Sequence, residues 1–313
     1  WDKLEKSNLP KELVEITNNF VKSKSYNTVS KFWRHIVINH FKALSKATSK
    51  EMQTLIIHSD YVSRTFFNNE NFSTLEDINF IKEEIKFDSF YRHKNMSYQE
   101  SLSYNITAAI YFARKKHLLK DNYENIYKKF YEDFSDSIKI NQYNINQHLM
   151  YSLNELDKID FLLNKKNENI NILEFGAGYG RTANAILSTK KKVKYIIVDI
   201  PPSLYVSTLQ FRKHYPNLKI THAFNIEEKE QLHNEIEKND IIYIFPHQIE
   251  LLNKDFFDLS IMIGIINETE PKTLKNYMYQ VNKISKKLYM KVFKYSGLPF
   301  SFYKFYRYNE KKD

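Results

Sequence analysis

The sequence predicts an α/β protein, in which a parallel sheet is covered by helices on both faces and follows a mostly helical region. Two observations support this prediction. From about residue 170 onward, short apolar runs alternate with helical patterns, which is typical of a parallel sheet. Three of the five glycines of the chain lie within 176–180, between an apolar run and a helical pattern, where a tight turn would join a strand to a helix. We therefore expect an N-terminal helical region at 1–138 and a sheet domain at 139–313.

The N-terminal region is expected to consist of helices separated by polar turns. Segment 9–23 places Leu13 and Phe20 on one face, behind a proline that suits the start of a helix. Segment 124–134 repeats this pattern, and 144–163 is expected to form a helix that leads into the first strand of the sheet. The many aromatic residues are expected to pack between helices; the alternative is that some of them line a sugar-binding cleft.

Beyond residue 170, strands and helices are expected to alternate. The expected helices are at 181–187, 201–215, 226–238 and 271–287. The expected strands are at 171–175, 194–200, 218–224, 240–246, 256–266 and 288–293, with a terminal strand at 301–308.

Composition limits the class of protein. Hydrophobic residues make up 42% of the 313 residues and aromatic residues 15%, which is enough for a packed core. The net charge is +10, but the lysine pairs are scattered, so we expect a solvated basic surface and no specific nucleic-acid partner. No apolar run is long enough to predict a membrane span, and no signal-peptide pattern opens the sequence. The lack of cysteine excludes disulfides and thiolate metal sites and fits a cytoplasmic location.

The spacing of the glycines separates two kinds of nucleotide site. Dinucleotide dehydrogenases use G-x-G-x-x-G, and here Arg181 occupies the third glycine position. The pattern is instead Glu174-x-Gly-x-Gly-x-Gly, which resembles the first motif of class I S-adenosylmethionine-dependent methyltransferases. In such a turn the backbone approaches the methionine part of the cofactor, whose amino group can be held by an acidic residue. Asp199 ends the next expected strand, where a carboxylate can accept both hydroxyls of a ribose.

This resemblance implies a Rossmann-like fold with S-adenosyl-L-methionine as cofactor and S-adenosyl-L-homocysteine as product. The residues expected to bind the cofactor lie in the glycine turn, after the second strand and in a later loop. They are Glu174, Phe175, Gly176, Ala177, Gly178, Tyr179, Gly180, Arg181, Asp199, Ile200, Pro246 and His247. For Arg181 the alternative is an ion pair with an acidic residue of a helix.

Longer stretches resemble a bacterial family of sugar O-methyltransferases associated with surface-polysaccharide biosynthesis. They are "LEFGAGYGR", "VDIPPSLYVS", "FPHQIELL" and "DLSIMIGIINETEP", and the resemblance covers roughly 140–295. It implies methyl transfer to a sugar hydroxyl, with a small-molecule or glycan substrate. The chain departs from the family at the end of the expected strand 256–266, where the family tends towards "S-x-Q-E-M" and this chain has Asn267 and Glu268.

Methyl transfer to a hydroxyl requires the acceptor oxygen to be positioned and its proton to be removed. Ligands of such folds bind beyond the carboxyl ends of the strands, which makes Glu268, His247 and Asn267 the catalytic candidates. Glu268 is expected to act as the base or to bind a sugar hydroxyl; the alternative is an exposed acid at the entry to a helix. His247 is expected near the adenine or as the base. No cluster with metal-ligand spacing is found, which favours a metal-independent reaction.

Several alternatives stay open at this point. The chain could methylate RNA or another non-sugar substrate, use a dinucleotide, or be a non-catalytic binding module. The N-terminal helices are expected to cap the cleft or to form a homodimer. The standard methyltransferase order needs one strand between Asp199 and Glu268, so either 218–224 or 240–246 is an additional strand.

Overall fold

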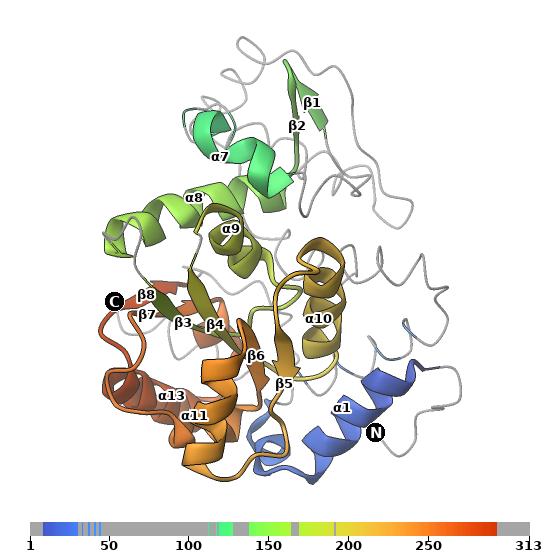
Figure 1. Ribbon diagram of the computed structural model, residues 1–313, viewed down its shortest axis with the longest axis vertical. Coiled ribbons are helices and arrows are strands. Elements are labelled where there is room, and N and C mark those ends of the chain that lie inside the picture. The colour runs from blue at the N-terminus through green and yellow to red at the C-terminus, as the bar shows by residue number, and fades with distance from the viewer. Residues whose placement is uncertain are drawn as a thin grey trace.

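The structure is a computed structural model that describes five segments of the chain and a few single residues between them. The segments are 9–30, 119–127, 138–163, 169–190 and 192–292, and the single residues are 33, 37, 41, 44, 112 and 117. Their main feature is a six-stranded sheet with the order β5-β6-β4-β3-β7-β8, in which every neighbouring pair is parallel (Figure 1). The fold is therefore α/β and Rossmann-like, as predicted.

All strands except β3 are shorter than the segments that predict them. Their bounds are β3 Ile170–Phe175, β4 Val193–Val198, β5 Ile220–His222, β6 Ile241–Ile244, β7 Leu259–Ile263 and β8 Leu288–Lys291. The chain enters at β3, adds β4 beside it, crosses to the edge strand β5, comes back to β6 between β5 and β4, and then crosses to the other side of β3 for β7 and β8. The direction of the connections therefore reverses between β3 and β7, and open α/β sheets bind ligands at such a point.

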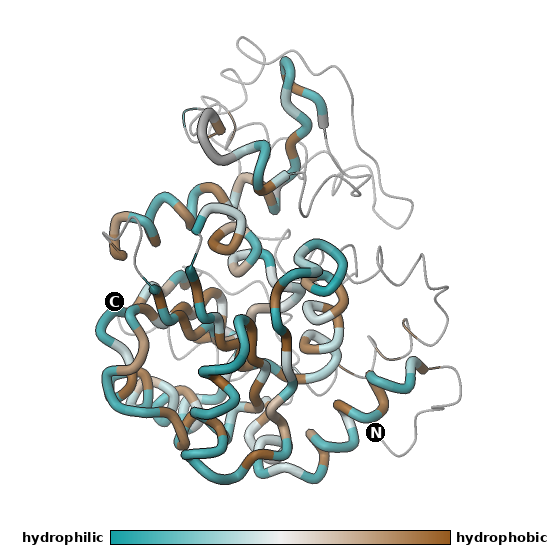
Figure 2. The backbone as a smooth tube through the Cα atoms, viewed as in Figure 1, coloured by the Kyte–Doolittle hydropathy of each residue, from teal (hydrophilic) through white to brown (hydrophobic). Residues whose placement is uncertain are grey.

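Helices cover the two faces of the sheet in separate sets. The first face carries α8 (Gln147–Leu163), α9 (Arg181–Thr189) and α10 (Ser203–His214), and the second carries α11 (Lys229–Lys238) and α13 (Pro271–Ile284). The strands alternate accordingly: Tyr195 and Ile197 of β4 face the first core, whereas Ile196 and Val198 face the second. In Figure 2 the central strands are mostly hydrophobic and α11 is mostly hydrophilic, as expected of strands buried on both faces.

The sheet order identifies the additional strand. β6 pairs with β4, and β5 pairs only with β6 among the described strands. Segment 240–246 therefore occupies the standard position beside β4, and 218–224 supplies an extra edge strand. The loop after β6, which begins the 3₁₀ helix η4 (Pro246–Leu251), is the one that reaches the site.

The first described helix packs against the sheet domain. Helix α1 (Lys11–Lys22) buries Leu13, Ile16 and Phe20, and the ring of Phe20 lies 5.2 Å from that of Phe245 in an edge-to-face contact. Glu12 of α1 pairs with Arg212 of α10 at 2.8 Å. The 3₁₀ helix η1 (Lys24–Thr28) continues from α1 and contacts η4. This region thus adds to the core of the sheet domain, while the division at 138/139 stays a prediction.

A small hairpin precedes α8. Strands β1 (Ile138–Ile140) and β2 (Tyr143–Ile145) pair antiparallel next to α7 (Leu119–Ile126), away from the large sheet (Figure 1). The hydroxyl of Tyr123 in α7 donates to the carbonyl of Asn144 and accepts from its backbone N–H. The expected terminal strand at 301–308 and most of the expected 124–134 helix lie outside the described residues.

Candidate functional site

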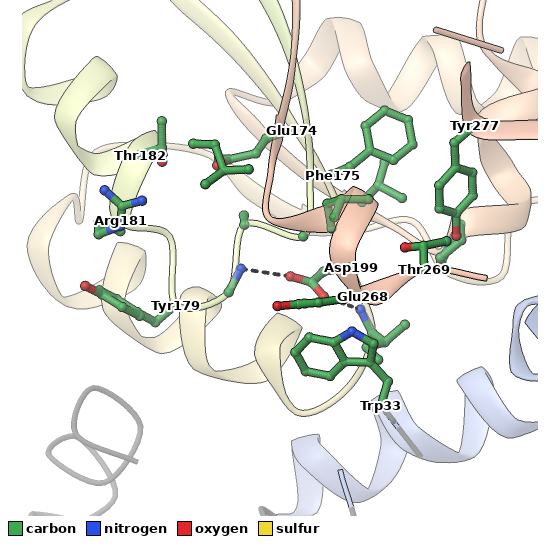
Figure 3. A pocket seen from close by; sticks show the side chains of 18 of the residues that line it. Trp33, Glu174, Phe175, Tyr179, Arg181, Thr182, Asp199, Glu268, Thr269 and Tyr277 are labelled. Atoms are coloured by element: carbon green, nitrogen blue, oxygen red, sulfur yellow. Dashed lines mark hydrogen bonds between the residues drawn. The ribbon is translucent and has the colours of Figure 1, made fainter. Parts of the chain in front are cut away.

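A cavity opens at the carboxyl ends of the central strands, at the point where the connections reverse direction. Its walls come from the turn after β3, the ends of β4, β7 and β8, helix α8 and the N-terminal segment around Thr28. All residues that the sequence predicts for cofactor binding line it, except Gly180 and His247. Figure 3 shows Arg181 and Tyr179 at one end, Thr269 and Tyr277 at the other, and Asp199 with Glu268 between them.

Each glycine of the turn has a positive φ, but each meets different surroundings. At Gly176, φ is +65°, and an added Cβ would overlap the Ile265 side chain. At Gly180, φ is +90°, and a Cβ would lie 2.6 Å from the ring of Phe211 in α10. At Gly178, φ is +59° and nothing lies within 4 Å of the Cβ position. Gly176 and Gly180 therefore allow close packing, whereas Gly178 keeps the backbone open to the cavity.

Asp199 follows β4 and faces the cavity with both carboxylate oxygens held. Its Oδ2 accepts from the backbone N–H of Gly178 at 2.9 Å, and its Oδ1 accepts from that of Ile200 at 2.7 Å. Burial raises the pKa of Asp199 to about 7, although these two hydrogen bonds favour the charged form. The carboxylate thus fixes the turn and retains lone pairs for a ligand hydroxyl.

Glu174 lies in β3, under the turn. Its Oε2 accepts from the hydroxyl of Tyr195 in β4 at 2.7 Å, and both residues are buried. Burial is the main cause that raises the pKa of Glu174 to about 7, while Tyr195 and Arg181 favour the charged form. A buried carboxylate at the cavity wall is suited to an ammonium group of a ligand.

Glu268 ends a short helix, α12 (Ile265–Glu268), and not a strand as the sequence suggests. Gly264, with φ of +75°, turns the chain out of β7 and into this helix. Glu268 is only 7% exposed, so the alternative of an exposed helix-entry acid is wrong. Burial, with the nearby charge of Asp199, raises the pKa of Glu268 to about 8, and a hydrogen bond from Trp33 partly opposes this. The position of the Asn267 side chain lies outside the described structure.

Arg181 begins α9 and pairs with a helix acid, the alternative considered for it above. Its guanidinium binds both oxygens of Glu155 in α8, at 2.7 Å and 3.0 Å. Lys291, at the end of β8, reaches the same carboxylate at 3.2 Å, and its Nζ lies 4.3 Å from the centre of the Tyr151 ring. Burial disfavours the charge of Glu155, but the two cations hold its pKa below the usual value. Arg181 and Lys291 nevertheless line the cavity.

His247 lies beside the cavity and not in its lining. Its Nδ1 and its backbone N–H both contact the hydroxyl of Ser25, each at 2.8 Å. The preceding Pro246 does line the cavity. The expected roles of His247 therefore stay predictions.

Several lining residues are not predicted by the sequence. Trp33, Thr28 and Tyr277 close one side of the cavity, and Tyr151 and Lys291 close another. Thr28 is hydrogen-bonded to Tyr277 through the side chains. Among the described residues, no group of three or more His, Asp or Glu side chains could hold a metal ion. Within the same part of the chain, no helix is long and apolar enough to cross a membrane.

Comparison with known proteins gives only distant structural likeness. No family profile and no curated protein matches the sequence. One similar structure is phosphoethanolamine N-methyltransferase 1 of Haemonchus contortus in complex with phosphoethanolamine and S-adenosylhomocysteine, with 11% identity, a TM-score of 0.31, 62% of this chain covered and 34% of that chain covered. The chain thus spans about a third of that protein. Another is a glutamate-to-glutamine mutant of MtNAS, with 14% identity, a TM-score of 0.27, 74% of this chain covered and 76% of that chain covered.

Proposed function

We propose that the protein is an S-adenosylmethionine-dependent methyltransferase that acts on a hydroxyl of a sugar. The main support is the position of Asp199, which ends β4 at the cavity and fixes the turn at Gly178. A carboxylate at this strand end can accept both hydroxyls of a ribose. The sequence resemblance described above motivates the sugar and the link to surface polysaccharides.

The residues of the cavity fit S-adenosylmethionine. The bare Cα of Gly178 leaves room for a ligand against the backbone, because nothing lies within 4 Å of its Cβ position. Glu174 is suited to the ammonium group of the methionine part. Ile200 and Pro246, which follow β4 and β6, offer apolar surface to the adenine. Arg181, in the place of the third glycine of G-x-G-x-x-G, argues against a dinucleotide.

The bound cofactor would supply an electrophilic methyl group, and the chain would supply the proton acceptor. Burial, with the charge of Asp199, raises the pKa of Glu268 to about 8, which makes its carboxylate a stronger base than that of an ordinary glutamate. The carboxylate would accept the proton of the acceptor hydroxyl as the methyl group leaves the cofactor sulfur for the hydroxyl oxygen. Trp33 donates a hydrogen bond to this carboxylate and orients it. No protein metal site is needed for this role.

The proposal includes a small-molecule or glycan acceptor and a cytoplasmic location, with no nucleic-acid partner. It also includes a homodimer through the N-terminal helices, to which the apolar face of α1 does not contribute because it packs on the sheet domain. Methylation of RNA is the alternative. Salt-sensitive binding of RNA would favour it.

Calorimetric titration tests the cofactor assignment directly. S-Adenosylhomocysteine is expected to bind the wild type with micromolar affinity and to bind Asp199→Asn at least about tenfold more weakly, because hydrogen bonds to a charged acceptor are lost. Asp240→Asn is the matched control, because Asp240 lies at the amino end of β6, at the opposite edge of the sheet. If the wild type binds NAD and not S-adenosylhomocysteine, the proposal is wrong.

A further inference from the structure

One end of the cavity carries an unusual arrangement of charge. Two cations, Arg181 and Lys291, meet the single buried carboxylate of Glu155. Arg181 alone satisfies both oxygens of Glu155, so an ion pair would be complete without Lys291. Lys291 therefore adds a second positive charge to a wall of the cavity where Arg181 is already paired with Glu155.

Lys291 is placed by rigid elements on both sides. Its backbone ends β8, where its carbonyl accepts from the N–H of Gly264, the residue that turns β7 into α12. Its ammonium lies over the ring of Tyr151 in α8, at a distance typical of a cation–π contact. The side chain is about a quarter exposed and lines the cavity. One donor reaches Glu155, and an ammonium has three.

The neighbouring groups of the same wall are suited to an anion. Arg181 and Thr182 are the first two residues of α9, whose amino end carries partial positive charge. His148 and Tyr151 complete the wall from α8. The acidic groups Asp199 and Glu268 lie further along the cavity, beyond the turn (Figure 3). Glu174 also lines the cavity near Arg181 and is assigned above to the ammonium group of the cofactor, which leaves Lys291 as the cation of this end for a further anion.

We propose that the methyl acceptor is a phosphorylated sugar, and that Lys291 and Arg181 bind its phosphate while its hydroxyl approaches Glu268. This assignment rests on the proposed function. The backbone bond between Lys291 and Gly264 fixes the cation relative to the helix that carries Glu268. A phosphate held there would position the sugar hydroxyl, and fixed positioning is a large part of catalysis in a displacement reaction.

The test uses inorganic phosphate as the probe, titrated at low salt into protein saturated with S-adenosylhomocysteine. Wild type is expected to bind phosphate, and Lys291→Met is expected to bind it at least about tenfold more weakly, because a charge-assisted hydrogen bond is lost. Lys291→Arg should restore binding. Lys287→Met is the matched control, since Lys287 immediately precedes β8 and its ammonium donates to the carbonyl of Leu162.

The outcomes separate this assignment from the cofactor assignment. Equal phosphate binding by wild type and Lys291→Met would show an adventitious ion only and overturn the phosphate site, as would no binding by wild type. If Lys291→Met weakens S-adenosylhomocysteine but not 5′-methylthioadenosine, which lacks the amino acid part, the cations hold the cofactor carboxylate and the phosphate site is wrong. Failure of wild type to bind S-adenosylhomocysteine would contradict the proposed function itself. Phosphate would then be titrated into the protein without S-adenosylhomocysteine, with the same two outcomes.

Discussion

The hydroxyl of Ser25 makes two hydrogen bonds to His247, one with its backbone N–H and one with Nδ1 of its ring, each at 2.8 Å. A backbone N–H can only donate, so the Ser25 oxygen accepts from it and retains a proton that it can donate to a neutral Nδ1. Burial lowers the pKa of His247, which favours the neutral ring. This contact joins η1 to η4, and it fixes the segment that brings Thr28 and Trp33 to the cavity.

Ser25→Ala is expected to lower the free energy of unfolding by about 1–3 kcal/mol, because the partly buried N–H of His247 loses its acceptor. Urea denaturation measures this change. The control is Thr189→Ala, whose hydroxyl only donates to carbonyls of its own helix, so its loss strands no donor. Equal effects of the two substitutions would contradict the role given to Ser25.

Two glycine substitutions should separate packing from ligand space. Gly180→Ala places a methyl group 2.6 Å from the ring of Phe211 and is expected to destabilise the fold by about 2–4 kcal/mol through backbone strain and overpacking. Gly178→Ala meets nothing within 4 Å, so only the strain of about 1 kcal/mol remains. Its methyl group faces the open site and should weaken S-adenosylhomocysteine at least about tenfold. Denaturation and calorimetry measure the two effects; a Gly178→Ala protein with unchanged affinity would contradict the prediction.

The stability of the protein should fall as the pH rises above 6.5. Burial raises the pKa of Glu268 from its usual 4.5 to about 8, so between these values the folded state binds a proton that the unfolded state has lost. Stability therefore decreases with pH in this window. Histidines whose pKa is lowered by burial make the stability rise with pH, but only below a pH of about 6.5, their pKa in the unfolded state. The range above pH 6.5 therefore tests the raised pKa values of the carboxyl groups.

The measurement is urea denaturation of wild type and Glu268→Gln from pH 6.5 to 8. The decrease for wild type should be steeper than that for the variant by up to about 1.4 kcal/mol per pH unit, the value of one proton. Glu174 contributes to both proteins and cancels in the comparison. The charge of Asp199 raises the pKa of Glu268, so the difference between the two proteins reports Glu268 together with its coupling to Asp199. Parallel curves would show that Glu268 is not protonated in the folded state.

The sheet and the glycine turn are predictable because their signals are local. The apolar runs of β3, β4, β6 and β7 and the positive φ values at glycine depend on a few consecutive residues. The alternation of strands and helices does not decide which of β5 and β6 is the additional strand, but composition distinguishes them. Strand β6 is apolar throughout and the structure buries it fully, whereas β5 contains polar residues and is only half-buried. A strand inside a parallel sheet is buried on both faces and therefore needs the continuous apolar sequence of β6.

The cavity walls are less predictable because they come from distant segments. Trp33 and Lys291 lie far from the glycine turn in sequence, and no local pattern relates either residue to Glu268 or Glu155. Glu155 does carry a signal, since it is a charge on the apolar face of α8 between the buried residues Leu153 and Leu156. A charge in such a position requires a partner, but only the fold identifies Arg181 and Lys291 as that partner.

Glu268→Gln should abolish most of the methyl transfer and leave cofactor binding intact. The amide keeps the shape of the side chain but cannot accept the acceptor proton, so the turnover of a phosphorylated sugar is expected to fall about 10²–10⁴-fold. Initial rates measure the loss, and calorimetry with S-adenosylhomocysteine should show an affinity within about threefold of wild type. A variant that turns over at the wild-type rate would remove Glu268 from the reaction.

Binding of the cofactor should be linked to the protonation of Asp199. Burial raises its pKa to about 7, and ribose hydroxyls that donate to the carboxylate favour its charged form. Affinity for adenosine should therefore be about tenfold higher at pH 8 than at pH 6, because the carboxyl must lose its proton before it binds. Adenosine is the right probe because it has the ribose but no ammonium group for Glu174. Asp199→Asn should bind adenosine more weakly and with no such pH dependence, whereas a full pH dependence in the variant would place the titrating group elsewhere in the cavity.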